Sequence, residues 1–135
     1  MSTNSIFFYI IVIAVFVSFL TNFGSSILLE PFLFLKNNGS SLYPSFENTF
    51  LVSHEWWRLI SPTFLHFSIT HLIFNCLWVY ILGSKIEIVD GKNIFIVLFL
   101  VAGLSSNLGQ YYWTGGYFFG GLSGAVYGLL GFCFI

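Results

Sequence analysis

The residues best suited to chemistry stand in two separate apolar stretches of the chain. Ser123 lies in the glycine-rich segment 120–124, while His71 and Asn75 lie four residues apart in the other stretch. Polar groups at membrane depth are costly to bury, so they are candidates for function. On an α-helix His71 and Asn75 are about 40° apart in projection and can face one neighbour. A serine that attacks a carbonyl, with an amide, an imidazole and its own backbone N–H as oxyanion donors, suits acyl transfer.

Each of these residues also has a structural interpretation. His and Asn in membrane helices often join helices through hydrogen bonds, and Ser often bonds to its own backbone. A nucleophilic serine also needs an adjacent base. His71 can be that base, although Asn75 beside it looks better placed as a donor than as its orienting partner. His66, on the same predicted helix, would point about 140° away from His71. His54 lies in a loop, and the sequence selects neither.

Glycines surround Ser123 at a regular spacing. Gly120, Gly124 and Gly128 recur every four residues and form one small-residue face, a pattern that lets membrane helices approach closely. This packing role is compatible with function, because it brings Ser123 near groups on a neighbouring helix. Tyr127 follows Ser123 by one helical turn on the same face, so it can support the base that activates the serine.

Composition places the chain among membrane proteins. Of 135 residues, 57% are hydrophobic and 7% are charged, against roughly 25% charged in soluble domains. The net charge is −1 with no basic run, which argues against a nucleic-acid partner because such binding needs clustered Lys and Arg. Cys76 and Cys133 lie in apolar runs as packing residues, and no metal site or cofactor is predicted.

Four apolar runs predict four transmembrane helices, at about residues 6–23, 64–83, 94–112 and 118–135. Their lengths suit the roughly 17–25 residues of a membrane-spanning helix. The first run has no Lys or Arg before it, which favours a retained helix over a signal peptide. The predicted fold is an all-α, multi-pass membrane helix bundle, forming a single domain over residues 1–135.

The segment 24–63 joins the first two runs and is rich in apolar residues. Loops of this length are usually functional, and Trp and Tyr favour the membrane–water interface. We expect it to fold against the membrane surface with short interfacial helices; a small external subdomain is the alternative. The positive-inside rule weakly favours a cytoplasmic connection at Lys85 to Lys92, which leaves segment 24–63 and the Ser123 end of the fourth helix outside.

Taken in order, the motifs resemble those of the rhomboid family of intramembrane serine proteases. The family's Gly-x-Ser-Gly motif corresponds to residues 121–124, followed by Tyr127, and its His-x-x-x-Asn motif corresponds to residues 71–75. Trp57-Arg58 matches the Trp-Arg pair of the family's long first loop, and Glu87 matches a glutamate at the end of the second helix. Each motif is short, but together and in order they are specific and cover nearly the whole chain.

The resemblance implies a bundle of six or more helices around a water-filled cavity that is open to the outside. It implies that Ser123 is the nucleophile and that His71, Asn75 and the Ser123 backbone N–H form the oxyanion hole. Substrates would be single-pass membrane proteins, cut near the outer membrane face at small residues beside a destabilised helix. No metal or cofactor is implied.

The resemblance also assigns supporting roles around these residues. Gly121 and Gly124 complete the serine motif, and Tyr127 would stack against the catalytic histidine. Trp57 and Arg58 would shape the first loop, with Arg58 bonding backbone carbonyls.

One part of the family pattern is missing. The family's general base is a histidine on a sixth helix, and no histidine follows Ser123 in these 135 residues. The sequence is therefore expected to stop in the fourth helix of six, as a fragment or truncated product, and to be inactive alone. Two other functions compete with a protease: a rhomboid-like protein that binds transmembrane helices without cleaving them, and a structural membrane protein with only packing glycines.

Overall fold

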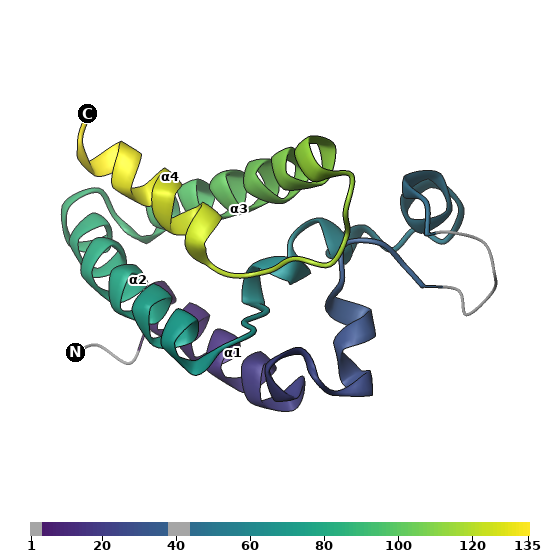
Figure 1. Cartoon of the computed structure of the whole chain (residues 1–135). Coiled ribbons are helices and arrows are strands. Elements are labelled where there is room, and N and C mark those ends of the chain that lie inside the picture. The colour runs from purple at the N-terminus through teal and green to yellow at the C-terminus, as the bar shows by residue number, and fades with distance from the viewer. Residues whose placement is uncertain (1–3, 38–43) are drawn as a thin grey trace.

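The computed structural model describes residues 4–37 and 44–135, and the regular secondary structure in this part of the chain is entirely helical. Its main elements are α1 (Ile6–Leu20), α2 (Ile69–Val89), α3 (Lys92–Thr114) and α4 (Ser123–Cys133). Helix α4 packs against both α2 and α3, and α1 packs against α2, while the segment between α1 and α2 forms the other end of the molecule (Figure 1). Helix α4, which begins at Ser123, is therefore held on two sides.

Each long helix buries one stripe of residues at spacings of three and four, as an amphipathic packing face requires. The stripes of α1 and α3 consist of Phe7, Ile10, Ala14, Val17 and Ser18, and of Phe95, Phe99, Gly103 and Asn107. The outward faces are apolar as well, with Phe16 64% and Phe19 65% exposed. A helix that is apolar all round is typical of a membrane environment.

Two of the four predicted spans meet the length and hydropathy expected of a membrane helix. Helices α2 and α3 have 21 and 23 residues and a mean hydropathy of 1.6 each. Helices α1 and α4 are apolar but shorter, with 15 and 11 residues. For these two helices, a full crossing of the membrane stays a prediction.

The helix boundaries differ from the predicted apolar runs for local reasons. Helix α1 stops at Leu20 rather than near residue 23, because Asn22 and Phe23 have φ angles of 45° and 51°, which a right-handed helix does not contain. Helix α2 starts at Ile69 rather than at residue 64, because the Ser68 hydroxyl accepts the His71 N–H and caps the helix.

Helix α3 extends past the predicted run 94–112 at both ends, over Lys92–Thr114. Gly91 (φ 95°) separates it from α2, and Gly115 (φ 68°) ends it in the left-handed conformation that glycine adopts most readily. Helix α4 starts five residues after the predicted start at 118. This last difference decides the position of Ser123.

The segment between α1 and α2 contains the short helical turns that the sequence predicts. They are Asn22–Gly24, Ile27–Phe32, Glu47–Val52, Trp56–Leu59 and Ser61–Phe64. Residues 38–43 of the predicted external loop lie outside the described residues. The buried ring of Phe34 contacts Phe50, Tyr111 of α3 and Phe119 of the connection to α4. The segment is thus packed onto the stretch of chain that leads into Ser123.

Candidate active site

A groove of about 370 Å³ lies between α2 and α4 and holds the chemically promising residues. His71 and Asn75 come from α2, and Ser123 and Tyr127 come from α4. The complete lining is His71, Phe74, Asn75, Trp78, Ser123, Val126, Tyr127 and Leu130. Two motifs that are far apart in the sequence therefore share one cavity, whose other walls are apolar.

Ser123 is the first residue of α4, not a residue inside a longer helix as the run 118–135 predicted. The residues before it are not helical, because Gly121 has a φ of 126° and its N–H donates to the Pro62 carbonyl at 3.0 Å. The N–H of Ser123 is thus one of the four amides that a helix leaves without an intrahelical acceptor. These amides form the positive end of the helix dipole, which stabilises a nearby negative charge.

Asn75 is 3% exposed, and its amide nitrogen Nδ2 has no hydrogen-bond partner within the described residues. Leaving a buried donor unsatisfied costs about 1–3 kcal/mol. Asn107 on α3 provides the contrast, since its Nδ2 donates to the Leu59 carbonyl at 2.8 Å and to Thr63 Oγ1 at 3.1 Å. Asn107 therefore has the structural, helix-joining role, whereas Asn75 presents a spare donor beside the groove.

The glycines of the serine motif are required by close contacts. A Cβ atom at Gly121 would lie 2.7 Å from Cε1 of His71, at a φ that other residues rarely adopt. A Cβ atom at Gly124 would overlap Ser106 of α3, and one at Gly128 would overlap Ala102. Gly124 and Gly128 of the predicted small-residue face thus bring α4 close to α3. Gly120 does not belong to that face, because it precedes α4 and packs against Leu65 and Pro62 instead.

His66 does not lie where the sequence interpretation placed it. Because α2 begins only at Ile69, His66 precedes the helix and the predicted 140° separation from His71 does not apply. The two rings instead meet edge to face, with centroids 5.2 Å apart. The side chain of His66 is fully buried, and its Nε2 accepts the Leu122 N–H at 3.3 Å. Recognising Ser68 as a helix cap would have corrected this interpretation.

Burial governs the charge of His66. It lowers the pKa of this imidazole to about 4, with a further lowering from the neighbouring His71 and an opposing effect from the hydrogen bond to the Phe64 carbonyl. His66 is therefore neutral at neutral pH.

Arg58 ties the first loop together. It is 2% exposed, its Nη1 donates to the carbonyls of Glu30 (2.8 Å) and Leu33 (2.9 Å), and its guanidinium forms ion pairs with the carboxylates of Glu30 and Glu55. The neighbouring Trp57 is half exposed and donates from Nε1 to the Pro31 carbonyl at 3.2 Å. Both residues hold the loop and lie outside the groove lining.

The remaining residues singled out in the sequence have simpler surroundings. Tyr127 lines the groove but is 73% exposed. A carboxylate oxygen of Glu87 accepts the Phe7 N–H at 2.8 Å and so joins the end of α2 to the start of α1. His54 is not among the groove-lining residues.

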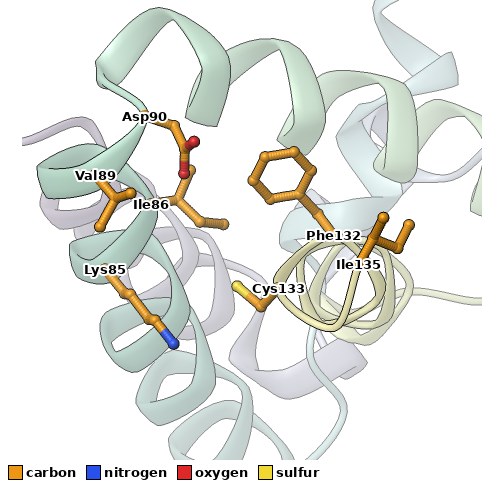
Figure 2. Close-up of a pocket in the computed structure, with 7 residues that line it drawn as sticks. All are labelled: Lys85, Ile86, Val89, Asp90, Phe132, Cys133 and Ile135. Carbon is orange, nitrogen blue, oxygen red and sulfur yellow. The ribbon is translucent and has the colours of Figure 1, made fainter.

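A second cavity of about 350 Å³ lies between the C-terminal ends of α2 and α4. Figure 2 shows Lys85, Ile86, Val89 and Asp90 facing Phe132, Cys133 and Ile135 across it. It lacks the set of hydroxyl, amide and imidazole that the first groove has. Among the described residues, no three His, Cys, Asp or Glu side chains gather as a metal site would need.

Comparison with known proteins settles the family. The rhomboid domain matches residues 53–135, which include both motifs of the groove. The chain belongs to the rhomboid family. The resemblance inferred from the motifs is thereby confirmed, and this rhomboid chain, with its two candidate spans, is part of an integral membrane protein.

The curated relatives are rhomboid proteases of bacteria. The chain is 34% identical to the rhomboid protease GluP of Bacillus subtilis over 107 residues, which cover 74% of this chain and 21% of GluP. It is 43% identical to GlpG of Pectobacterium atrosepticum over 79 residues (58% of this chain, 28% of GlpG). It is 40% identical to GlpG of Klebsiella pneumoniae over 81 residues (60% of this chain, 29% of GlpG). The chain thus spans less than a third of the length of these relatives.

Proposed function

We propose that these residues form part of an intramembrane serine endopeptidase that cleaves transmembrane segments of membrane proteins. Ser123 is the nucleophile, and its Oγ attacks the scissile carbonyl while its proton passes to a base. The amine then leaves with that proton, and water hydrolyses the acyl-enzyme to free the serine. No cofactor is needed, because each step is acyl transfer by side chains.

The observation that carries this proposal is Asn75 Nδ2, which has no partner among the residues that the structure describes and lies in the same groove as Ser123. A buried donor without an acceptor is unfavourable in the resting protein, but it gains a partner when an oxyanion forms. The Ser123 N–H, at the start of α4, is a second donor, because it has no acceptor within its helix. Asn75 and Ser123 thus offer hydrogen bonds that are realised only in the transition state, which is what lowers a barrier.

His71 completes the proposed oxyanion hole. Its ring lies close to Gly121, two residues before the serine, and it lines the groove together with Ser123. Gly121 allows this close approach, Gly124 lets α4 pack against Ser106 of α3, and Tyr127 would pack against the histidine that acts as base. Trp57 and Arg58 are assigned structural roles in the first loop.

The base that takes the Ser123 proton is not one of the residues assigned above. His66 already engages both ring nitrogens with neighbouring groups, so it has no free site for the serine proton. His71 is assigned as a donor. In the proposal, the proton is taken by a histidine on a later helix, in a bundle of six helices of which α1 to α4 are the first four.

The apolar surroundings of the groove support substrates that lie in the membrane. Apart from the polar residues, its walls are Phe74, Trp78, Val126 and Leu130, and the outer helix faces are apolar. We assign single-pass membrane proteins as substrates, presented from the lipid bilayer. A rhomboid that binds such helices without cleaving them is the alternative, and it predicts binding that is independent of Ser123.

The test is cleavage of a transmembrane reporter by the full-length protein and by its Ser123→Ala variant, reconstituted in liposomes. The proposal expects cleavage by the wild type and none by the variant, with equal binding of the reporter. Cleavage by Ser123→Ala at the wild-type rate would refute the role of Ser123. Binding without cleavage by either protein would favour the inactive alternative.

A further inference from the structure

His66 joins three parts of the protein that surround the serine. Its ring is fully buried between α1, the segment before α2 and the start of α4. Nδ1 lies 3.3 Å from Ser18 Oγ of α1 and 3.3 Å from the Phe64 carbonyl. Nε2 lies 3.3 Å from the backbone nitrogen of Leu122, the residue immediately before Ser123.

The partners of His66 fix where its proton resides. A backbone N–H can only donate, so Nε2 must be the unprotonated nitrogen when it meets the Leu122 amide. The proton then sits on Nδ1 and points at acceptors, since the Phe64 carbonyl only accepts. The Ser18 hydroxyl is also an acceptor, because it spends its own proton on the Ala14 carbonyl at 2.7 Å. The network is consistent only with a neutral, Nδ1-protonated imidazole.

This imidazole touches both sides of the proposed active site. Through Leu122 it holds the turn that ends at Ser123, together with the bond from the Gly121 N–H to the Pro62 carbonyl. Its ring also packs edge to face against the ring of His71, at a centroid distance of 5.2 Å. A shift of about 1 Å in a reacting group can cost on the order of 10²-fold in rate, so a group that fixes both partners affects turnover.

We propose that His66 is a positioning residue for the serine reaction, which holds Ser123 through the Leu122 amide and holds the His71 ring by contact. The inference rests on the proposed function, because it assumes that Ser123 reacts. His66 itself does not exchange a proton with the substrate. Its neutral tautomer is what allows the hydrogen bond to Leu122.

Three substitutions in the full-length protein separate the hydrogen bond from the packing. In His66→Gln the side-chain oxygen can reach the place of Nε2 and accept the Leu122 N–H. In His66→Asn the shorter amide can serve the Nδ1 partners but leaves Leu122 without an acceptor. In His66→Phe the ring against His71 is kept and both nitrogens are lost.

We expect His66→Gln to retain kcat within a few fold, and His66→Asn and His66→Phe to lose up to about 10²-fold in kcat with little change in KM. Melting temperatures in the same detergent show whether each variant folds. Equal kcat for folded Gln, Asn and Phe variants would overturn the proposal. Loss of kcat in His66→Gln equal to that in His66→Asn would overturn it as well.

A second measurement does not depend on activity. In ¹⁵N-histidine labelling of the full-length protein in detergent, the signals that disappear in His66→Gln are those of the His66 ring. We expect a neutral ring at pH 7 with its proton on Nδ1. A charged ring, or a proton on Nε2, would overturn the proposal. If the wild type cleaves nothing while this tautomer is present, the failure lies in the proposed function and not in the hydrogen-bond network.

Discussion

Replacing Asn75 by Leu should make the protein more stable and less active at once. Asn75 Nδ2 is buried without a partner in the described part of the chain, beside an otherwise largely apolar groove. Leu has a comparable shape, and the groove of about 370 Å³ has room for its methyl groups. The substitution therefore removes an unsatisfied polar group without creating a clash.

Asn75→Leu is expected to raise the free energy of unfolding and to lower kcat. Relief of the unsatisfied donor stabilises the folded protein by about 1–3 kcal/mol. Loss of one oxyanion donor typically lowers kcat by about 10²–10³-fold. If the side chain joined helices instead, its loss would lower stability and leave turnover intact. The sign of the stability change thus distinguishes the two roles.

Asn107→Leu is the matched control, because Asn107 is an equally buried asparagine on the adjacent helix with two partners. It should lower the melting temperature, since the Leu59 carbonyl and Thr63 hydroxyl lose their donor. Both variants are measured in one detergent, by thermal melting and by kcat on the same transmembrane reporter. A lower melting temperature for Asn75→Leu with kcat preserved would refute the reasoning.

Three further predictions follow from other residues. Arg58→Ala should cost about 3–5 kcal/mol in stability, because the carbonyls of Glu30 and Leu33 lose their donor and the carboxylates of Glu30 and Glu55 lose their buried cation. Lys36→Ala breaks only a partly exposed pair with Glu55 and should cost under about 1 kcal/mol; equal losses in thermal melts would contradict this. Because the pKa of His66 is lowered to about 4 and an unfolded histidine titrates near pH 6.5, the folded protein should be fully stabilised above about pH 6.5. It should lose up to about 3 kcal/mol as the pH falls to about 4, a slope that His66→Gln should flatten in melts across this range. The polypeptide of residues 1–135 alone should react poorly with a fluorophosphonate probe, because no base is assigned within it; strong labelling that His71→Ala abolishes would identify His71 as the base.

The family, and the residues that share one face of a helix, could be predicted from the sequence because they depend on local spacing. The four-residue spacing of His71 and Asn75 fixes a helix face, and the spacing of Gly124 and Gly128 fixes the face that packs against α3. The identity of the helices followed from hydropathy in the same way. Each of these features is set within one helix, so no knowledge of the rest of the fold was needed.

The sequence was less informative where one element ends because of contacts with another. The position of His66 depended on the cap at Ser68, which shortens α2 at its start. The sequence could not show that Asn107 Nδ2 has two hydrogen-bond acceptors whereas Asn75 Nδ2 has none among the described residues. Both are single asparagines in apolar runs. The difference arises because the Leu59 carbonyl and the Thr63 hydroxyl lie opposite Asn107, and their positions are set by the fold of the first loop.

The late start of α4, at Ser123 rather than at residue 118, is the departure from the sequence prediction on which the proposed chemistry depends. Had the helix begun at residue 118, the Ser123 N–H would donate to the carbonyl of residue 119, as every interior helical amide does. It would then be unavailable to an oxyanion. Instead Gly121, with its φ of 126° and its bond to Pro62, delays the helix until Ser123. The hydroxyl, the free amide and the positive end of the helix dipole therefore coincide at one residue. Hydropathy cannot reveal this, because Phe118, Phe119 and Leu122 are as apolar as a helix would require. The signal was the Gly120-Gly121 pair, which marks a break in the backbone.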